Sequence, residues 1–303
     1  MQQNFPKRVK LVEVSPRDGL QNEDRIIPTD IKVDFINLLS QTGLSMIEAT
    51  SFVSPKWIPQ LADHCPVMQQ LIRKPGVKYS ALVPNQQGLE NAFKLKTDCV
   101  AVFTAASDSF TQQNTNCSLK DSVARAVEII KAAASQKTAS RAYISCAWYC
   151  PYEEKINLDT VINIADTLYK AGCKEIVISD TIGKATAADV YARLNKISQI
   201  IPQENLAVHF HDTYGQAIAN IYASLELGIS IIDASVSGLG GCPYAKGAGG
   251  NVASEDVLFL LNEMDIKTGI DMNKLLLAGE FINEFLQKPT ESKVARALTK
   301  QTV

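Results

Sequence analysis

Short runs of apolar and β-branched residues alternate along the chain with longer stretches in which apolar residues recur at helical spacing. Residues 175–179, for example, are almost continuously apolar, as expected for a strand that is buried on both faces of a parallel sheet. Eight runs have the length and composition of strands: residues 9–14, 46–49, 78–83, 99–103, 141–147, 175–179, 206–210 and 229–235. Clear helical spacing occupies residues 30–42, 119–135, 158–171, 187–200, 214–227 and 253–264.

This order of elements predicts an α/β fold, a (β/α)8 TIM barrel, because eight strand–helix units follow one another at the spacing of βαβ repeats. The competing architecture is an open doubly wound sheet, but no glycine-rich nucleotide-binding motif follows the first strand. Residues from Gly269 onward are helical and charged, so we expect extra C-terminal helices on the outside of the barrel. No Ser/Gly-rich or Pro-rich linker interrupts the pattern, and we therefore expect a single domain over residues 1–303.

The balance of charge limits the kinds of partner. The formal net charge is −2, which gives no reason to expect nucleic acid or an anionic membrane as a partner. No apolar run approaches the ~18 residues that a membrane-spanning helix requires. The seven cysteines are odd in number and irregularly spaced, no secretory signal precedes them, and the first eight residues are too few for a targeting peptide. We therefore expect a cytoplasmic protein with reduced thiols.

Charged residues stand at the ends of three predicted strands. In a (β/α)8 barrel the chemistry lies at the C-terminal ends of the strands, so a polar residue directly after a strand is a site candidate. Arg17 and Asp18 follow the first strand, Glu48 closes the second and Asp180 ends the sixth. An isolated Arg–Asp pair is more often a simple ion pair in a loop, and a lone glutamate at a strand end is equally well a surface residue.

Two histidines, His209 and His211, end the seventh strand in a His-x-His pattern. Strand alternation places both imidazoles on one face, and they are two of the three histidines in the chain. Together with Asp18 and Asn251 they offer two nitrogens and two oxygens, which suit an octahedral Mg²⁺ or Mn²⁺ better than a closed structural zinc site. The alternative is a pair of histidines hydrogen-bonded in a loop. The third histidine, His64, lies in a helical stretch and is expected to be structural.

A glycine-rich segment follows the eighth strand. Six of the fourteen residues from Gly238 to Asn251 are glycine, so this loop can approach a ligand closely. It does not match the dinucleotide-binding motif, which belongs after a first strand. The loop contains Cys242, and a cysteine in a glycine-rich loop at this face of a barrel is a candidate reactive group. The alternative is an incidental, partly buried thiol.

Four segments of the sequence resemble those of a known enzyme family. They are Ser-Pro-Arg-Asp-Gly-Leu-Gln-Asn-Glu (residues 15–23), Ser-Phe-Val-Ser-Pro-Lys-Trp (51–57), Asp-Thr-Ile-Gly (180–183) and Ser-Val-Ser-Gly-Leu-Gly-Gly-Cys-Pro-Tyr-Ala (235–245). The chain resembles the hydroxymethylglutaryl-CoA lyases along essentially its whole length, and the last segment is similar to that family's signature around its catalytic cysteine. Leu20 stands where the related condensing synthases of the wider superfamily usually have glutamate, which favours the lyase branch.

The resemblance implies cleavage of (S)-3-hydroxy-3-methylglutaryl-CoA to acetoacetate and acetyl-CoA, assisted by Mg²⁺ or Mn²⁺. It implies that Arg17 stabilises the enolate that forms on the thioester and that Cys242 protonates it. His209 or Asp180 is expected to remove the hydroxyl proton, and Glu48 is expected to orient Arg17. The substrate-binding residues expected from these segments are Arg17, Gln21, Thr181 and Gly241. An acyl-CoA substrate and a homodimer are the partners that the resemblance implies.

Three alternatives remain open. The first is a lyase for a longer branched 3-hydroxyglutaryl-CoA, because several positions depart from the family pattern. These positions are Asp24, Thr104, Val177, Ser179 and Ser237. The second is a 2-isopropylmalate- or citramalate-type synthase, which runs the related condensation, although Leu20 and the loop of Cys242 argue against it. The third is a non-catalytic metal- or CoA-binding barrel, and the complete set of candidate site residues argues against that.

Overall fold

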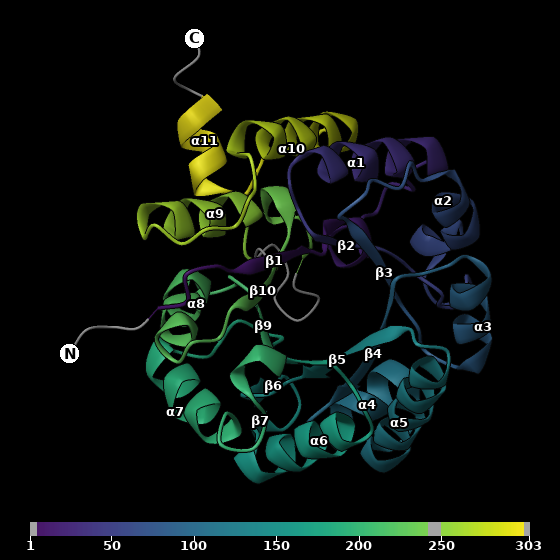
Figure 1. The fold of residues 1–303 in the computed structure, drawn as a ribbon, viewed down its shortest axis with the longest axis vertical. Helices are drawn as coiled ribbons and strands as arrows, with labels where there is room; N and C mark the ends of the chain where they lie inside the picture. The colour runs from purple at the N-terminus through teal and green to yellow at the C-terminus, as the bar shows by residue number, and fades with distance from the viewer. Residues whose placement is uncertain (1–4, 242–249, 300–303) are drawn as a thin grey trace.

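The computed structural model of the protein describes residues 5–241 and 250–299. Eight parallel strands close into a barrel in the spatial order β1-β10-β9-β8-β5-β4-β3-β2 (Figure 1). The barrel strands are β1 (Lys10–Glu13), β2 (Met46–Ser51), β3 (Lys78–Leu82), β4 (Cys99–Ala105), β5 (Ala139–Ser145), β8 (Glu175–Asp180), β9 (Leu206–Phe210) and β10 (Ile231–Ala234). The predicted (β/α)8 barrel is confirmed, and the open sheet is excluded because β1 pairs with both β2 and β10.

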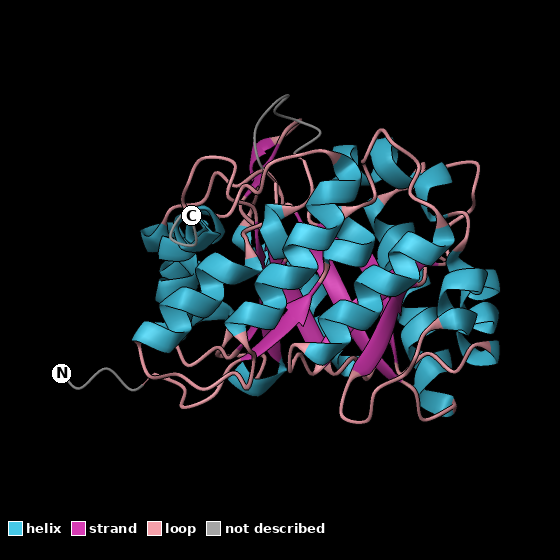
Figure 2. Ribbon diagram, turned by 90° about the horizontal axis from the view of Figure 1, so that it is seen from above, coloured by secondary structure: helices cyan, strands magenta, loops and turns pink. Residues whose placement is uncertain are grey.

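Helices form the outer layer around the strands (Figure 2). They are α1 (Thr29–Gln41), α2 (His64–Gln70), α3 (Gln86–Lys94), α4 (Asp108–Thr115), α5 (Leu119–Ser135), α6 (Leu158–Lys170), α7 (Ala187–Ile197), α8 (Ala217–Glu226), α9 (Ser254–Glu263), α10 (Met272–Leu286) and α11 (Lys293–Thr299). Helix α10 packs against α1 and α9, which confirms the expected C-terminal helices on the outside. Within residues 5–241 and 250–299, no helix is both long and apolar enough to cross a membrane.

The periodicity did not predict the short elements α3 and α4 or the antiparallel pair of β6 (Tyr149–Cys150) and β7 (Glu154–Lys155). Helix α4 shows why, because only Phe110 and Thr111 of its eight residues are buried and the apolar signal is weak. Its start is fixed instead by a capping bond, in which the Phe110 amide donates to the Ser107 hydroxyl at 3.0 Å.

Alternation along the strands sorts side chains between the interior of the barrel and the layer under the helices. One buried cluster draws on every barrel strand and fills the apolar part of the interior. It contains Val12, Met46, Leu82, Cys99, Ala101, Tyr143, Val177, Ala207 and Ile231. The same inward-facing positions also carry buried charged and polar groups from β2, β5, β9 and β10, namely Glu48, Arg141, His209 and Asp233. These polar groups lie among the candidate site residues or next to them.

Candidate active site

The chain leaves β1 through a wide helical turn, Ser15–Gly19. The Leu20 amide donates to the Ser15 carbonyl oxygen at 2.9 Å, one residue further along the chain than in an α-helix. Wide turns of this kind occur frequently at functional sites. This turn carries Arg17 and Asp18, and it places both side chains at the C-terminal mouth of the barrel.

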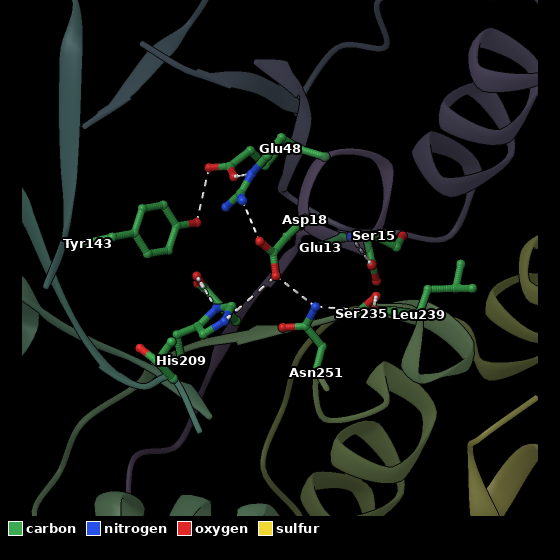
Figure 3. A network of polar contacts seen from close by, with 12 residues as sticks. Glu13, Ser15, Asp18, Glu48, Tyr143, His209, Ser235, Leu239 and Asn251 are labelled. Atoms are coloured by element: carbon green, nitrogen blue, oxygen red, sulfur yellow. Dashed lines mark hydrogen bonds and ion pairs between the residues drawn. The ribbon is translucent and has the colours of Figure 1, made fainter. Parts of the chain in front are cut away.

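Arg17 lies between two carboxylates. Its Nε donates to Oε1 of Glu48, and its Nη1 donates to Oδ1 of Asp18. The other oxygen of Glu48 accepts from the Tyr143 hydroxyl at 3.0 Å, and the Arg17 guanidinium lies 5.5 Å from the centroid of the Tyr143 ring (Figure 3). Burial would lower the pKa of Arg17, but the two carboxylates outweigh burial and hold that pKa above its ordinary value. Glu48 and Tyr143 therefore fix the orientation of a permanently charged group.

Asp18 connects this arginine to the histidines. Its Oδ2 accepts from Nδ2 of Asn251 at 2.8 Å and lies 3.9 Å from Nε2 of His209 (Figure 3). Burial favours the neutral acid, but Arg17 and the two histidines outweigh it and hold the pKa of Asp18 well below its usual range. Asp18 is therefore an ionised carboxylate, the form that binds a cation.

Asp18, His209 and His211 could together hold a divalent cation, because one ligand atom from each lies within 4.8 Å of the others. In the described part of the chain, Nδ1 of His211 is buried and has no hydrogen-bond partner, so it is available to a ligand. Burial and the neighbouring His209 lower the pKa of His211 to about 4. The imidazole is therefore neutral near pH 7, which is the form that binds metals.

Asn251, the fourth expected ligand, lies beside this group. An isolated β-bridge pairs it with His211, and its Nδ2 donates to Asp18 and, at 3.1 Å, to the Leu239 carbonyl oxygen. Turning the amide over would place its oxygen where Nδ2 now meets Asp18. One carboxylate, two imidazoles and one amide leave positions for substrate oxygens, so this donor set fits a divalent metal ion.

The metal-binding group lines a pocket of about 550 Å³ at the mouth of the barrel. This volume is in the usual range for sites that bind small molecules. Gln21, Thr181 and Gly241, which we expected to contact substrate, all line the pocket. The Thr181 hydroxyl also accepts from the Cys146 amide at 2.8 Å, which fixes its orientation. The apolar part of the lining includes Trp57, Leu82, Phe103 and Phe110.

The structure does not bring Asp180 into this group. Asp180 shares the outer face of β8 with the core residues Ile176 and Ile178, whereas the next residue, Thr181, lines the pocket. Its carboxylate accepts from the Ala185 amide at 2.8 Å and so closes the loop after β8. Burial raises the pKa of Asp180 to about 6. The hypothesis that Asp180 is the general base therefore conflicts with its position.

Cys242 lies outside the described residues. On the two sides of that segment, the Gly250 amide donates to the Gly240 carbonyl oxygen at 2.9 Å, and Gly241 lines the pocket. A Cβ atom on Gly250 would lie 2.4 Å from that carbonyl oxygen, so this close approach requires glycine. The described chain therefore reaches the wall of the pocket at Gly241.

Two buried glutamates, which the sequence analysis did not single out, hold the loops after β1 and β10. Glu13 accepts from the Ser15 amide at 3.0 Å and from the Val236 amide at 2.9 Å (Figure 3). Both oxygens of Glu255 accept from the Ser237 amide at 2.9 Å. Burial raises the pKa of both glutamates, that of Glu255 to about 8. Glu13 therefore ties the loop that carries the site arginine to the loop after β10.

The sequence analysis also missed an ion pair that lies behind His209. Arg141 donates to both oxygens of Asp233, and Oδ2 of Asp233 lies 3.4 Å from Nδ1 of His209. Burial would raise the pKa of Asp233, but Arg141 outweighs burial and holds it below its ordinary value. The sequence did contain a signal for this pair. Each of the two charged residues lies at an inward-facing position of a buried strand, and a buried charge needs a partner.

A closed (β/α)8 barrel whose mouth carries a carboxylate, two imidazoles and a permanently charged arginine defines a metal-assisted barrel enzyme. Comparison with protein families shows to which family of such enzymes the chain belongs. A family model described as HMGL-like matches residues 8–282. The chain belongs to the HMGL-like family.

Individual relatives support this assignment. The chain is 52% identical over 293 residues to the cytoplasmic 3-hydroxy-3-methylglutaryl-CoA lyase of Rattus norvegicus, a match that covers 97% of this chain and 85% of the relative. It is 49% identical over 293 residues to the mitochondrial hydroxymethylglutaryl-CoA lyase of Gallus gallus, with 97% and 98% covered.

Solved structures agree with the sequence comparison. The hydroxymethylglutaryl-CoA lyase from Pseudomonas aeruginosa matches with a TM-score of 0.96 at 50% identity, covering 98% of this chain and 99% of that one. An HMG-CoA lyase from Acinetobacter baumannii, in complex with coenzyme A and 3-methylmalate, matches with a TM-score of 0.91 at 35% identity, with 96% and 95% covered. The resemblance to hydroxymethylglutaryl-CoA lyases is confirmed.

Proposed function

We propose that the protein is a divalent-metal-dependent carbon–carbon lyase that cleaves (S)-3-hydroxy-3-methylglutaryl-CoA to acetoacetate and acetyl-CoA. The relatives named above are lyases for this substrate. The observation that carries the proposal is the wide turn after β1, which holds Arg17 and Asp18 against the two histidines inside one pocket. Cleavage of a 3-hydroxyacyl thioester needs both an electrophilic site for the hydroxyl oxygen and a cation for the developing enolate.

Asp18, His209, His211 and Asn251 are the residues that we assign to Mg²⁺ or Mn²⁺. When bound, the ion supplies Lewis-acid chemistry, which makes the C3 hydroxyl more acidic and fixes its position. Asp18 contributes the negative charge of the set, because the nearby Arg17 keeps it ionised. The histidines contribute imidazole nitrogens, which favour Mn²⁺ over Mg²⁺.

We assign to Arg17 the stabilisation of the enolate. When the C2–C3 bond breaks, C3 becomes the carbonyl carbon of acetoacetate and the bonding electrons pass to the thioester as an enolate. In the described contacts Arg17 uses Nε and Nη1, so Nη2 has a donor to offer to the enolate oxygen. Glu48 holds the guanidinium in place for this bond. A fixed donor of this kind costs no reorganisation at the moment of reaction.

Two roles compete for Nε2 of His209, that of metal ligand and that of general base, and Asp180 is poorly placed to take the second role. Asp180 faces the outer layer and its carboxylate is taken by backbone amides, whereas Nε2 of His209 faces the metal-binding group. One nitrogen can bind a cation or accept a proton, but not both at once. His209→Gln separates these roles: a ligand role predicts weaker Mn²⁺ binding and activity that returns at high Mn²⁺, whereas a base role predicts unchanged Mn²⁺ affinity and a rate that stays low.

The substrate class in this proposal is an acyl-CoA. The apolar lining of the pocket, with Leu82, Phe103 and Phe110, suits the acyl and pantetheine parts of such a molecule. A homodimer and a cytoplasmic location belong to the same proposal, and the relatives from rat and human are named cytoplasmic. Light scattering of the purified protein tests the dimer.

The experiment that tests the function is one assay. Purified protein is incubated with 3-hydroxy-3-methylglutaryl-CoA and Mg²⁺ or Mn²⁺, with and without EDTA, while acetyl-CoA and acetoacetate are followed. We expect both products to appear in equal amounts and only when metal is present. Cleavage of a longer branched ester alone, or condensation of acetyl-CoA with a 2-oxoacid, would move the substrate assignment to that compound.

A further inference from the structure

Arg141 and Asp233 are buried charges that the proposed reaction does not use. They are 0% and 1% exposed. Nη2 of Arg141 donates to Oδ1 of Asp233 at 2.7 Å, and Nη1 donates to Oδ2 at 3.3 Å. Taking two charges out of water is costly, so such a pair is weak evidence for a purely stabilising role.

The carboxylate of Asp233 faces His209. The register of β9 and β10 places the two residues side by side, and Oδ2 of Asp233 lies 3.4 Å from Nδ1 of His209. A carboxylate paired with Arg141 is a hydrogen-bond acceptor, so a hydrogen bond between Asp233 and Nδ1 of His209 requires the proton on Nδ1. The lone pair then belongs to Nε2, the nitrogen that lies 3.9 Å from Oδ2 of Asp18.

The same arginine holds the His209 ring from a second direction. The Tyr143 ring meets the His209 ring edge to face, with centroids 5.8 Å apart and an interplanar angle of 87°. Nη1 of Arg141 donates to the Tyr143 hydroxyl at 3.0 Å. His211 differs, because its buried Nδ1 has no hydrogen-bond partner in the parts of the chain that the structure describes. Only one of the two histidines is thus anchored through its Nδ1.

We infer that Asp233 is a positioning residue: held by Arg141, it fixes His209 with Nδ1 protonated and directs the lone pair of Nε2 to the metal site. The purpose of this arrangement rests on the proposed metal-dependent function, but the arrangement itself is a property of the metal-free protein. Carboxylates that hold a metal-binding histidine in this way typically change metal affinity by about 10–100-fold.

The first test uses the unmodified protein without metal. Nitrogen-15 NMR of the imidazole rings reports which nitrogen carries the proton in each histidine. The chain has only three histidines, so His64→Gln and His211→Gln assign the signals. We expect His209 to be protonated at Nδ1. A proton on Nε2 of His209, or a mixture of the two forms, would overturn the inference.

The second test is Asp233→Asn. Arg141 should hold the new carbonyl oxygen in the place of Oδ1, so the amide nitrogen faces Nδ1 of His209 and drives the proton to Nε2. We expect this change of tautomer and an increase in the Mn²⁺ dissociation constant of about 10–100-fold, measured by electron paramagnetic resonance. A folded Asp233→Asn protein with the original tautomer and Mn²⁺ affinity overturns the inference. If the variant does not fold, the NMR measurement of the His209 tautomer in the unmodified protein tests the inference by itself.

Glu255→Gln is the matched control, because it replaces another fully buried acidic side chain by its amide, at a position that contacts Ser237 rather than the histidines. It should leave the tautomer and the Mn²⁺ affinity unchanged. The proposed function can fail independently of this inference. In that case 3-hydroxy-3-methylglutaryl-CoA is not cleaved, while the tautomer of His209 and the Mn²⁺ affinity still change as expected in Asp233→Asn.

Discussion

Arg17 is a cation that two carboxylates and a tyrosine hold in one orientation at the mouth of the barrel. If it stabilises the enolate, Arg17→Met should lower the turnover number by about 10²–10³-fold, or about 3–4 kcal/mol, as for other oxyanion donors. Steady-state kinetics at saturating Mn²⁺ measure this. Arg17→Lys should retain part of the rate, because it keeps the charge but loses the fixed fork of donors. A loss below tenfold for the methionine variant would count against the role.

Asp18 supplies the ionised carboxylate of the proposed metal site. Asp18→Asn removes that charge while keeping the size, so the Mn²⁺ concentration that gives half-maximal activity should rise. Direct Mn²⁺ binding should weaken in parallel. Asp24→Asn, at an exposed carboxylate on the same loop, should leave both quantities unchanged. An unchanged Mn²⁺ requirement in Asp18→Asn would remove Asp18 from the ligand set.

Cys242 stays a proposed acid for the enolate, on the resemblance of its loop and on the position of Gly241 in the pocket wall. Cys242→Ala should lower turnover by several orders of magnitude with little change in Mn²⁺ affinity, because the thiol is assigned to proton transfer and not to the metal. Rates near those of the unmodified enzyme would exclude this role.

Of the individual site residues, the sequence predicted those polar residues that directly follow a strand. Arg17 and the histidine pair were found in this way. The strand-end criterion ignores alternation, so it also selected Asp180, which shares the outer face of β8 with the core residues Ile176 and Ile178. Arg141 and Asp233 were missed for another reason. They occupy interior strand positions, and their partners come from strands that are distant in sequence.

At the scale of elements, the loops after β1 and β10 depend on Glu13 and Glu255. The pKa of Glu255 is raised from 4.5 to about 8 by burial, so the folded protein keeps a proton that the unfolded chain releases between these values. The stabilisation from this proton is complete below the unfolded pKa and is lost as the pH rises through the folded pKa.

Glu255→Gln should therefore remove a pH dependence of stability. Relative to the variant, the unmodified protein should lose up to about 1.4 kcal/mol of unfolding free energy per pH unit over this range. Urea unfolding at about pH 5.5 and at about pH 7.5 measures the difference. Glu263→Gln, at an exposed position of the same helix, should show no such trend. A constant difference between the Glu255 variant and the unmodified protein would contradict the raised pKa.

The eight barrel strands were predictable because they are buried almost throughout and are mostly apolar. The longer helices were predictable because their apolar stripe persists over several turns. Helix α4 and the β6–β7 pair could not be predicted, since a capping serine and a tight turn define them and not a repeating pattern. The wide turn after β1 likewise follows from its contacts with the barrel mouth, which no local pattern encodes.

At the scale of the whole molecule, the proposed metal ligands come from distant parts of the chain. Asp18 follows β1, His209 lies in β9 and His211 directly follows it, and Asn251 follows β10. A bound ion therefore links the first strand to the last two, across the place where the barrel closes. Mn²⁺ at a hundred times its dissociation constant should stabilise the fold by about 2.7 kcal/mol. Thermal unfolding with Mn²⁺ and with EDTA checks this, and Asp18→Asn should lose most of the difference.

The contacts at the barrel mouth have a consequence for charge balance. The side chains contact one another in a closed circuit of Arg17, Glu48, Tyr143, Arg141, Asp233, His209 and Asp18. The two arginines and three carboxylates of this circuit sum to a net charge of −1. A divalent cation changes this to +1, and one substrate carboxylate then cancels it. We therefore expect ordered binding, with the ion first, and a much lower acyl-CoA affinity in EDTA by calorimetry. Until the ion arrives, the buried charge repels the substrate.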